Sequence, residues 1–310
     1  MRPASRNQLW RYKTQIIRPF DPWKSRLCTC PPKFTLDPYT GCEHRCLYCY
    51  ASSYIRRFYE CRPKKDLLRK VERDLRKLPG NALISISNSS DPYTPMESKL
   101  MLTRGCLRLF RRRSRDLRIL LITKSDLVAR DVDLLLGLRC AVTFTITTLD
   151  ESLARRLEPG APTPPRRIEA VRRLSGEGIP VGVRVDPIIP FLNDGEVEEI
   201  LREAKDAGAV HATFSTLKPR PDGWRRLENA FPEVCEKLRP LYFVEGERIG
   251  RSYYLPKPLR FRLVRGAAEL AERLGLSYAC CREGFPELNR AGSCDGSHLI
   301  PVKPIREWIG

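Results

Sequence analysis

The chain has few amide side chains and no long apolar run. Its 310 residues include only two Gln and six Asn, against 26 Pro, and scarce amides with many prolines are typical of thermophile proteins. No apolar stretch reaches the ~20 residues that a membrane helix needs. The first 27 residues are basic and aromatic, without the apolar centre of a secretory signal. We therefore expect a cytoplasmic protein with no membrane partner.

Acidic residues are also scarce relative to basic ones. The 37 Asp and Glu stand against 56 Lys and Arg, which gives a net charge of +19. Such a charge attracts polyanions, nucleic acid above all, although an arginine-rich thermophile surface explains it equally well. Hydrophobic residues make up 42% of the chain, which excludes a disordered protein and permits a sizeable core.

Short apolar runs alternate with longer helical patterns from about residue 80 onward. The expected strands cover 82–87, 117–123, 141–147, 179–185 and 210–215, with a further short one near Phe34. The expected helices cover 64–78, 97–113, 126–136, 164–176, 194–207 and 224–239. Apolar strands at ~30-residue spacing are typical of βαβ units in a parallel sheet. We predict an α/β fold, a partial (β/α)6 TIM-type barrel, whose site lies at the carboxyl ends of the strands.

The predicted barrel occupies part of the chain. We assign 1–33 to a basic N-terminal extension, 34–240 to the barrel and 241–310 to a C-terminal extension with one more helix near 259–274. The sequence contains no repeat and no low-complexity linker. Both extensions are therefore expected to belong to one domain.

Three of the twelve cysteines form a tight group in the segment GCEHRCLYCYA. Cys42, Cys46 and Cys49 follow a short predicted strand, and such spacings let three thiolates bind one iron–sulfur cluster. Three thiolates leave one iron of a four-iron cluster open to a substrate. Zinc is the alternative, but it needs a fourth ligand, which only Cys28 or Cys61 would supply easily because His44 lies inside the first spacer.

The triplet resembles the signature of the radical S-adenosylmethionine (SAM) superfamily. The resemblance extends over about residues 34–215 and is greatest to the spore photoproduct lyase-like branch. The segments that resemble this branch are SNSSDPYTPME (87–97), TKSDLVARDVDLL (123–135), FTITTLDESLARRLEPGAPTPPRRIEAVRRL (144–174) and VDPIIPFLND (185–194). It implies a [4Fe-4S] cluster that cleaves SAM reductively to a 5′-deoxyadenosyl radical, which abstracts hydrogen from the substrate. It also implies an electron donor such as a ferredoxin or flavodoxin.

The same resemblance implies roles for several side chains around SAM. Lys124 matches a lysine that pairs with the SAM carboxylate, and Ser90 and Thr145 match hydroxyl residues that bond the methionine moiety. Tyr48 and Tyr50 flank Cys49 and are expected to shield the cluster or stack on adenine. Surface solvation of Lys124, β propensity at Thr145 and plain burial of the tyrosines are the alternatives.

Two further candidates are an acid and an arginine. Asp91 stands at the position where many radical SAM enzymes have a Gly-Gly-Glu run that contacts the SAM amino group. An Asp before a Pro would also suit a plain turn. Arg167 lies in PPRRIEA, which resembles a segment near the cofactor, although helix-surface charge is an equal explanation.

One position departs from the lyase pattern. The lyase has a hydrogen-donating cysteine immediately before the serine matched to Ser90, whereas this chain has Ser89. An O–H bond is too strong for that role, so we do not expect spore photoproduct repair by the same route. Tyr93, Cys140 or a group on the substrate remain as hydrogen donors.

Five outer cysteines suggest a second metal site. They stand at the two ends of the chain: Cys28, Cys30, Cys280, Cys281 and Cys294, with His298 close to the last. If the ends meet, these thiols can hold a second iron–sulfur cluster or zinc. Disulfides and buried free cysteines are the alternatives. His211 lies within a predicted strand and is expected to be a core residue.

Two segments are candidates for contact with nucleic acid. Residues 104–118 contain seven Arg, which a solvated helix face would also explain. The basic N-terminal extension is the better candidate because it interleaves aromatic rings with basic residues. This combination suits contacts with phosphates and stacked bases. Its residues are Trp10, Tyr12 and Trp23 among Arg2, Arg6, Arg11, Lys13, Arg18, Lys24 and Arg26.

These observations favour a radical SAM enzyme that modifies or repairs a nucleic acid. We place RNA ahead of DNA because modified bases are numerous in structured RNA. One alternative is a radical SAM enzyme acting on a protein or small molecule. Another is a non-catalytic iron–sulfur or zinc protein that binds nucleic acid, which would have no use for a SAM pocket.

Overall fold

The computed structural model describes Leu9, Ser25 and residues 11–20, 27–86, 88–113 and 116–304. Parts of the two basic segments that are candidates for nucleic-acid contact lie outside these residues. The positions concerned are Arg2, Arg6, Trp10, Trp23, Lys24, Arg26 and Arg115.

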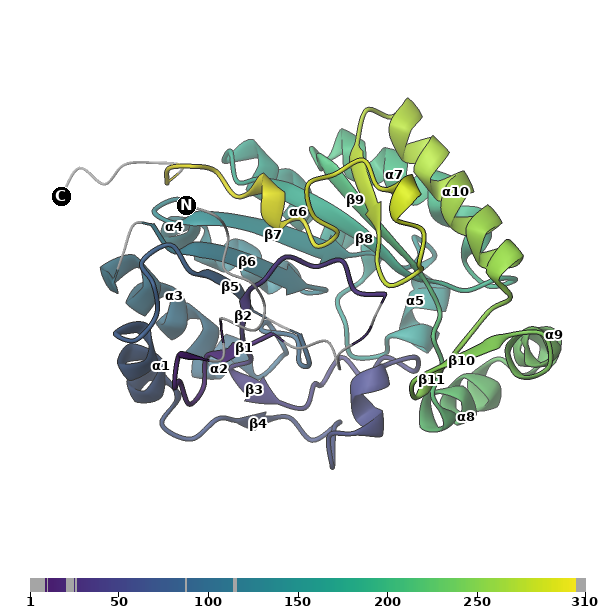
Figure 1. Ribbon diagram of the computed structural model, residues 1–310, viewed down its shortest axis with the longest axis horizontal. Coiled ribbons are helices and arrows are strands. Elements are labelled where there is room, and N and C mark those ends of the chain that lie inside the picture. The colour runs from purple at the N-terminus through teal and green to yellow at the C-terminus, as the bar shows by residue number, and fades with distance from the viewer. Residues whose placement is uncertain are drawn as a thin grey trace.

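An eight-stranded sheet forms the centre of the molecule (Figure 1). Its strands, in spatial order, are β1 (Arg18–Pro19), β2 (Phe34–Leu36), β5 (Leu83–Ile86), β6 (Arg118–Thr123), β7 (Arg139–Thr145), β8 (Val181–Ile188), β9 (His211–Thr216) and β12 (Ser277–Cys280). All neighbours are parallel except β1 and β2. The six predicted parallel strands are confirmed. A seventh, β12, comes from the C-terminal extension.

Helices follow the parallel strands as the sequence predicts. They are α1 (Leu67–Leu75), α2 (Glu97–Leu100), α3 (Leu102–Arg113), α4 (Val132–Leu135), α5 (Glu151–Leu157), α6 (Pro164–Gly176), α7 (Val197–Asp206), α8 (Pro221–Ala230), α9 (Pro232–Phe243) and α10 (Lys257–Arg273). Short 3-10 segments are η2 (Tyr50–Ser53), η3 (Asp126–Asp131), η4 (Asp194–Glu196), η5 (Pro286–Leu288) and η6 (Ser297–Leu299). Two small antiparallel pairs join β3 (Tyr39–Thr40) to β4 (Arg62–Pro63) and β10 (Glu247–Ile249) to β11 (Ser252–Tyr254).

Two helices that the sequence predicts as continuous are each divided into two α-helices, and the one expected over 126–136 is mainly the 3-10 segment η3, followed by the short α4. The first breaks at Met101, whose φ of 51° is left-handed, and the Glu97 carboxylate caps the next helix by accepting from the backbone N–H groups of Thr103 and Arg104. The second breaks before Pro232, which begins α9 because proline suits a first helical turn and not a helix interior. Local caps therefore decide these boundaries.

The strands are buried on both faces, and alternate residues serve different layers. Ile84, Ile119 and Val142 face the outer layer, where α1, α3, α6, α7 and α10 supply the main core. Leu83, Leu120 and Ala141 face the other side, which Ile300 of the C-terminal segment covers. Burial on both faces explains why these strands read as unbroken apolar runs.

The two ends of the chain meet over the inner face of the sheet. Lys33 and Asp295 form an ion pair there, and both side chains are at most 3% exposed. Their segments, purple and yellow in Figure 1, cover the same side of the sheet. Among the described residues, no helix combines the length and hydrophobicity needed to cross a membrane.

Candidate functional site

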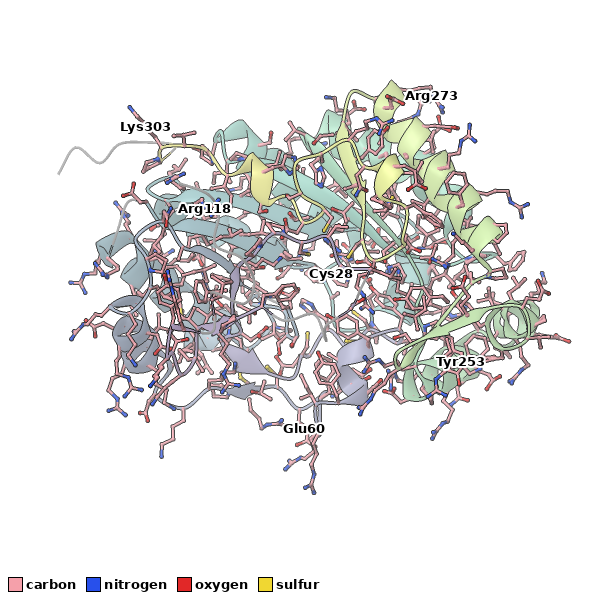
Figure 2. The ribbon with its side chains drawn as sticks, viewed as in Figure 1. Cys28, Glu60, Arg118, Tyr253, Arg273 and Lys303 are labelled. Carbon is pink, nitrogen blue, oxygen red and sulfur yellow. The ribbon has the colours of Figure 1, made fainter. Side chains whose placement is uncertain are left out.

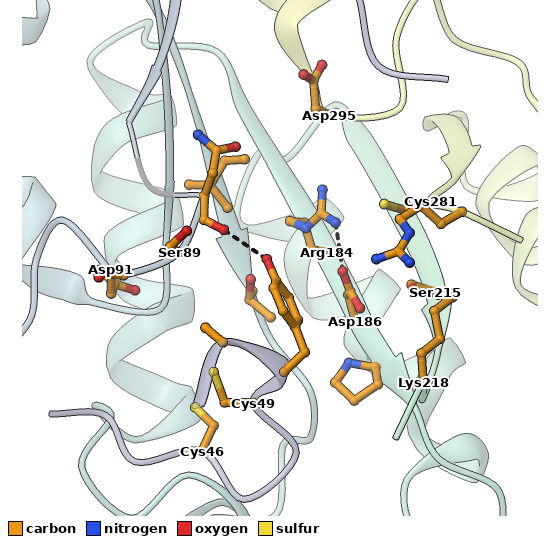
Figure 3. Close-up of a pocket in the computed structure, with 18 of the residues that line it drawn as sticks. Cys46, Cys49, Ser89, Asp91, Arg184, Asp186, Ser215, Lys218, Cys281 and Asp295 are labelled. Atoms are coloured by element: carbon orange, nitrogen blue, oxygen red, sulfur yellow. Dashed lines mark hydrogen bonds and ion pairs between the residues drawn. The ribbon is translucent and has the colours of Figure 1, made fainter. Parts of the chain in front are cut away.

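A cavity of ≈ 490 Å³ lies at the carboxyl ends of the strands (Figure 3). Its wall includes the ends of β5, β6, β7, β8 and β9, the cysteine loop, and parts of both chain termini. The volume falls within the range of cofactor and ligand sites. The position confirms where the predicted barrel directs the search for a site.

The loop that carries the three cysteines is fixed by close backbone contacts. The Gly41 backbone has a φ of +85°, and a Cβ there would lie 2.3 Å from the Phe58 carbonyl oxygen. At the other side, the Gly160 N–H donates to the His44 carbonyl at 2.9 Å and the Leu47 N–H donates to the Leu157 carbonyl at 3.0 Å. The segment after α5 therefore positions the cysteine loop through main-chain bonds.

Cys42, Cys46 and Cys49 all line the cavity. Burial raises the pKa of the Cys46 thiol well above its usual value and that of Cys49 to about 11. The Cys46 and Cys49 thiols are therefore protonated at neutral pH, and a metal that binds them must displace their protons.

The donor set fits an iron–sulfur cluster better than one zinc ion. The closely spaced cysteines of one loop suit a cluster, which distributes its ligands over separate irons, whereas one structural zinc ion needs a fourth ligand. The extra zinc ligands considered above have other neighbours in the structure. Cys61 bonds to Thr94, Cys28 bonds to Cys30, and His44 Nδ1 lies 3.4 Å from Asp91.

Lys124 stands at the end of β6 and lines the cavity. Its Nζ lies 3.4 Å from the Glu158 carboxylate and 5.5 Å from the centre of the Tyr48 ring. The Tyr48 hydroxyl donates to the same carboxylate. The structure thus brings Lys124 and Tyr48 together, as expected for neighbours in one site, and adds Glu158 as their common partner.

Arg167 does not reach the cavity. It is 1% exposed, bonds the Thr145 carbonyl at 3.2 Å and pairs with Glu158 at 2.5 Å. Two cations, Arg167 and Lys124, therefore hold the pKa of Glu158 far below its usual range despite the opposing effect of burial. The contact predicted between Arg167 and a cofactor is replaced in the structure by a contact with Glu158.

Asp91 lines the cavity and links the segment after β5 to the end of β6. Its Oδ1 accepts from the Thr123 hydroxyl at 2.6 Å and its Oδ2 from the Lys124 N–H at 2.8 Å. Desolvation opposes ionisation, but His44 and these hydrogen bonds lower the pKa of Asp91. The carboxylate is therefore ionised and orients the start of the Lys124 loop.

The remaining predicted residues also line the cavity. Ser90 is 4% exposed and donates to the Tyr39 carbonyl at 3.2 Å, and Thr145 ends β7. The Tyr50 hydroxyl donates to the Asn88 carbonyl at 2.8 Å, and its ring stacks on Tyr54. All three contribute to the wall that faces the cysteine loop.

The hydrogen donors considered from the sequence lie away from this wall. Tyr93 is fully buried and bonds Asp131 at 3.1 Å, and the Cys140 thiol bonds the Leu135 carbonyl. Among the described residues, the lining of the cavity includes neither. Ser89, which replaces the lyase cysteine, does line it.

The wall opposite the cysteine loop carries charged residues that the sequence did not single out. Arg184 pairs with Asp186 at 2.7 Å on β8, and the Lys218 ammonium bonds Ser215 at 2.6 Å and Glu283 at 2.5 Å. Figure 3 shows them across the cavity from Cys46 and Cys49. The sequence VRVDP, which contains Arg184 and Asp186 at the end of a predicted strand, could have indicated them. Polar residues at the end of an apolar strand lie at the edge of a barrel where the site is found.

The outer cysteines separate into a group and an outlier. Cys28, Cys30, Cys281 and Cys294 all line the cavity. Cys280, the last residue of β12 and the neighbour of Cys281 in the sequence, does not. All twelve cysteines lie in the described part of the chain, and none is in a disulfide. His211 is fully buried and bonds Ser277 and Thr213, as expected of a core residue.

Three comparisons relate the chain to known proteins. The model of the radical SAM superfamily matches residues 36–204. An uncharacterized protein of Methanocaldococcus jannaschii is 33% identical over 210 residues, or 66% of this chain and 78% of that protein. An uncharacterized protein of Mycobacterium bovis is 28% identical over 294 residues, or 88% of this chain and 81% of that protein.

A solved structure shares the fold. Spore photoproduct lyase in complex with a dinucleoside spore photoproduct superimposes with a TM-score of 0.63 at 17% identity, over 86% of this chain and 79% of the lyase. At this identity the likeness concerns the architecture alone. It agrees with the α/β fold that the sequence predicts, a partial TIM-type barrel, and with the largely parallel sheet of the structure.

Proposed function

The chain belongs to the radical SAM superfamily. We propose that it is an enzyme that cleaves SAM reductively and abstracts hydrogen from a nucleic acid. Of the two nucleic acids, we favour RNA over DNA as the substrate. One observation carries the proposal. The thiols of Cys42, Cys46 and Cys49 and the strand-end groups of Ser90, Lys124 and Thr145 line the same cavity.

The cofactors that the superfamily implies are a [4Fe-4S] cluster and SAM. When bound, they supply the one-electron cleavage of SAM and the hydrogen abstraction that begins the reaction. Cys42, Cys46 and Cys49 would hold the cluster through their thiolates. Lys124 supplies a positive charge for the SAM carboxylate, and the hydroxyl groups of Ser90 and Thr145 offer hydrogen bonds to its methionine part.

Glu158 and Arg167 act as positioning residues in this proposal. The carboxylate holds Lys124 and Tyr48, and the guanidinium holds the carboxylate. The buried Glu158–Arg167 pair fixes the position of the carboxylate. The Lys124 ammonium, which pairs with that carboxylate, is therefore held beside the cysteine loop before a ligand binds.

The electrostatics of the chain support a nucleic-acid substrate. The net charge of +19 attracts phosphates, and Arg184 and Lys218 stand on the wall across from the cysteine loop. The solved lyase, which has the same fold, holds a dinucleoside.

The catalytic part is tested by product analysis. Protein reconstituted anaerobically with iron and sulfide and then reduced is expected to convert SAM into 5′-deoxyadenosine. A variant with Cys42, Cys46 and Cys49 all changed to Ala serves as the control and should form none. Absence of the nucleoside from fully loaded wild-type protein would contradict the proposal and favour a non-catalytic metalloprotein.

The substrate class is tested by binding. Mixed RNA is expected to bind with an affinity that falls steeply as salt rises, because each neutralised phosphate of a single strand contributes a slope of about −0.7 in log affinity against log salt. Duplex DNA of equal length is the comparison. Weak binding of both, with SAM still cleaved, would point to a protein or small molecule.

A further inference from the structure

Four thiols from the two ends of the chain meet at the edge of the cavity. Cys30 and Cys294 lie 3.4 Å apart between their sulfur atoms, although 264 residues separate them. Cys28 and Cys281 line the same cavity, where the Cys28 thiol hydrogen-bonds Cys30 and the Cys281 thiol hydrogen-bonds Cys294. Figure 2 shows Cys28 near the centre of the molecule, while labelled charged residues such as Arg273 and Lys303 project from its periphery. We call Cys28, Cys30, Cys281 and Cys294 the terminal thiol group.

The backbone that carries these thiols is held in place. The Cys294 carbonyl accepts from the Thr213 hydroxyl at 2.9 Å, and the Cys281 N–H donates to the Phe214 carbonyl at 2.8 Å, so both are tied to β9. On the N-terminal side, the buried Lys33 pairs with Asp295, one residue beyond Cys294. The group is therefore preorganised and not a chance meeting of mobile ends.

Strand parity explains why Cys280 stays out of the group. Neighbouring residues of a strand point to opposite faces, and Cys280 ends β12 in the main core, where it is 4% exposed. Cys281 points instead to the cavity, beside Arg184 (Figure 3). Adjacent cysteines in the sequence thus serve different layers, which gives a matched pair for an experiment.

A single disulfide would use only two of these four sulfurs. The spacing suits a metal: at about 2.3 Å per Zn–S bond, the sulfurs of a regular tetrahedron lie ~3.8 Å apart, close to the 3.4 Å between Cys30 and Cys294. Thiolates on a four-iron cluster each bind a different iron and diverge further. The contact therefore favours one ion.

We propose that Cys28, Cys30, Cys281 and Cys294 bind one Zn²⁺, separate from the centre at the cysteine triplet. Among the described residues, no three or more His, Cys, Asp or Glu side chains are already arranged to hold a metal ion, so the four thiols do not yet surround one point. The Cys30 and Cys294 sulfurs are already in contact, and Cys28 and Cys281 line the same cavity, so binding requires the side chains to turn toward a common centre. The ion joins the N-terminal segment to the C-terminal tail across the cavity edge.

Metal analysis of the full chain tests the site without relying on activity. The protein is purified anaerobically with Zn²⁺ present, and zinc and iron are counted per chain. Wild type and Cys280→Ala are expected to hold one zinc, and Cys28→Ala and Cys281→Ala to lose most of it. The iron bound at the triplet should be the same in all four proteins.

A second measurement covers the case in which these variants fold poorly. The variant with Ala at 42, 46 and 49 lacks the triplet but keeps the terminal thiol group. Titrated with Co²⁺, it is expected to bind one ion with the intense visible and charge-transfer bands of a tetrahedral thiolate site. This readout is independent of SAM cleavage, so failure of the enzyme proposal and failure of the zinc proposal are distinguishable.

Three results would overturn the proposal. The first is zinc content that is the same in Cys280→Ala and Cys281→Ala. The second is iron in place of zinc, lost from the Cys28→Ala and Cys281→Ala variants. The third is a Cys30–Cys294 disulfide found by peptide mapping of protein kept anaerobic throughout.

Discussion

The Glu158 carboxylate and the Arg167 guanidinium form a buried ion pair, with 2.5 Å between Oε2 and Nη1 and at most 1% of either side chain exposed. The other carboxylate oxygen accepts from Thr147 at 2.7 Å and faces Lys124. One acid therefore holds two cations, one buried behind the cavity wall and one at its surface. This relationship leads to the first prediction.

Replacement of Glu158 by Gln should destabilise the protein by about 3–5 kcal/mol, because the change leaves Arg167 buried without its counter-charge. The free energy of unfolding in urea measures the effect. Glu151→Gln is the control, since that residue pairs with Arg155 on the exposed face of the same helix. We expect its effect to stay below ~1 kcal/mol. Equal effects of the two changes would show that the buried pair is unimportant.

Replacement of Lys124 by Ala should weaken SAM binding by roughly 10–100-fold in the loaded protein, because one charge-assisted hydrogen bond contributes ~1.5–3 kcal/mol. Equilibrium dialysis with labelled SAM checks this. Lys99→Ala, at an exposed position in α2, removes the same charge far from the site. Unchanged affinity in Lys124→Ala would remove this residue from the proposed SAM pocket.

Replacement of Gly160 by Ala should displace the cysteine loop, because the new Cβ would lie 1.9 Å from the Glu43 carbonyl oxygen. We expect reduced iron per chain after reconstitution. Gly176→Ala is the control: its Cβ meets nothing within 4 Å, and Ala in place of a helical Gly stabilises by ~0.5–1 kcal/mol. Full iron loading of Gly160→Ala would contradict the role given to this contact.

Acid should destabilise the fold through His211 before it affects the carboxylates. Burial lowers the pKa of His211 to about 3, against ~6.5 in the unfolded chain. Between these values only the unfolded state takes the proton, so stability falls as pH falls, by up to ~1.4 kcal/mol per pH unit. Urea unfolding between pH 6.5 and 5 measures the slope.

His211→Gln should lessen this slope. His298 packs against His211 and its pKa is lowered as well, so part of the slope should persist until His298 is also replaced. A slope unchanged by His211→Gln would mean that the ring is protonated in the native protein.

Much of the fold could be predicted because the local sequence patterns agree with the places that the segments take in the sheet. The run 117–123 is apolar and became β6, Arg118–Thr123, and Lys124 follows it directly into the cavity. The cysteine loop was recognisable because its ligands are neighbours in the sequence. Where chemistry depends on spacing within one segment, the sequence is sufficient.

Other features depend on contacts that no local pattern encodes. Nothing in PPRRIEA indicates whether Arg167 faces a cofactor or a buried acid, because that depends on the rotation of α6 over the sheet. The strand β12, SYAC, is too short to show alternation, so its place beside β9 was missed. Strand parity could separate Cys280 from Cys281 only once that strand was known.

The position of β12 also bears on how the protein folds during synthesis. Its partner β9 ends at Thr216, but β12 begins only at Ser277, so β9 remains an edge strand while some sixty residues are still to be made. An unpaired apolar edge is a template for intermolecular pairing. The helix α10 emerges before β12 and packs against β9, so it can cover one face of that strand while its open edge still awaits a partner. The nascent chain is therefore most exposed to aggregation in the interval before its last strand arrives.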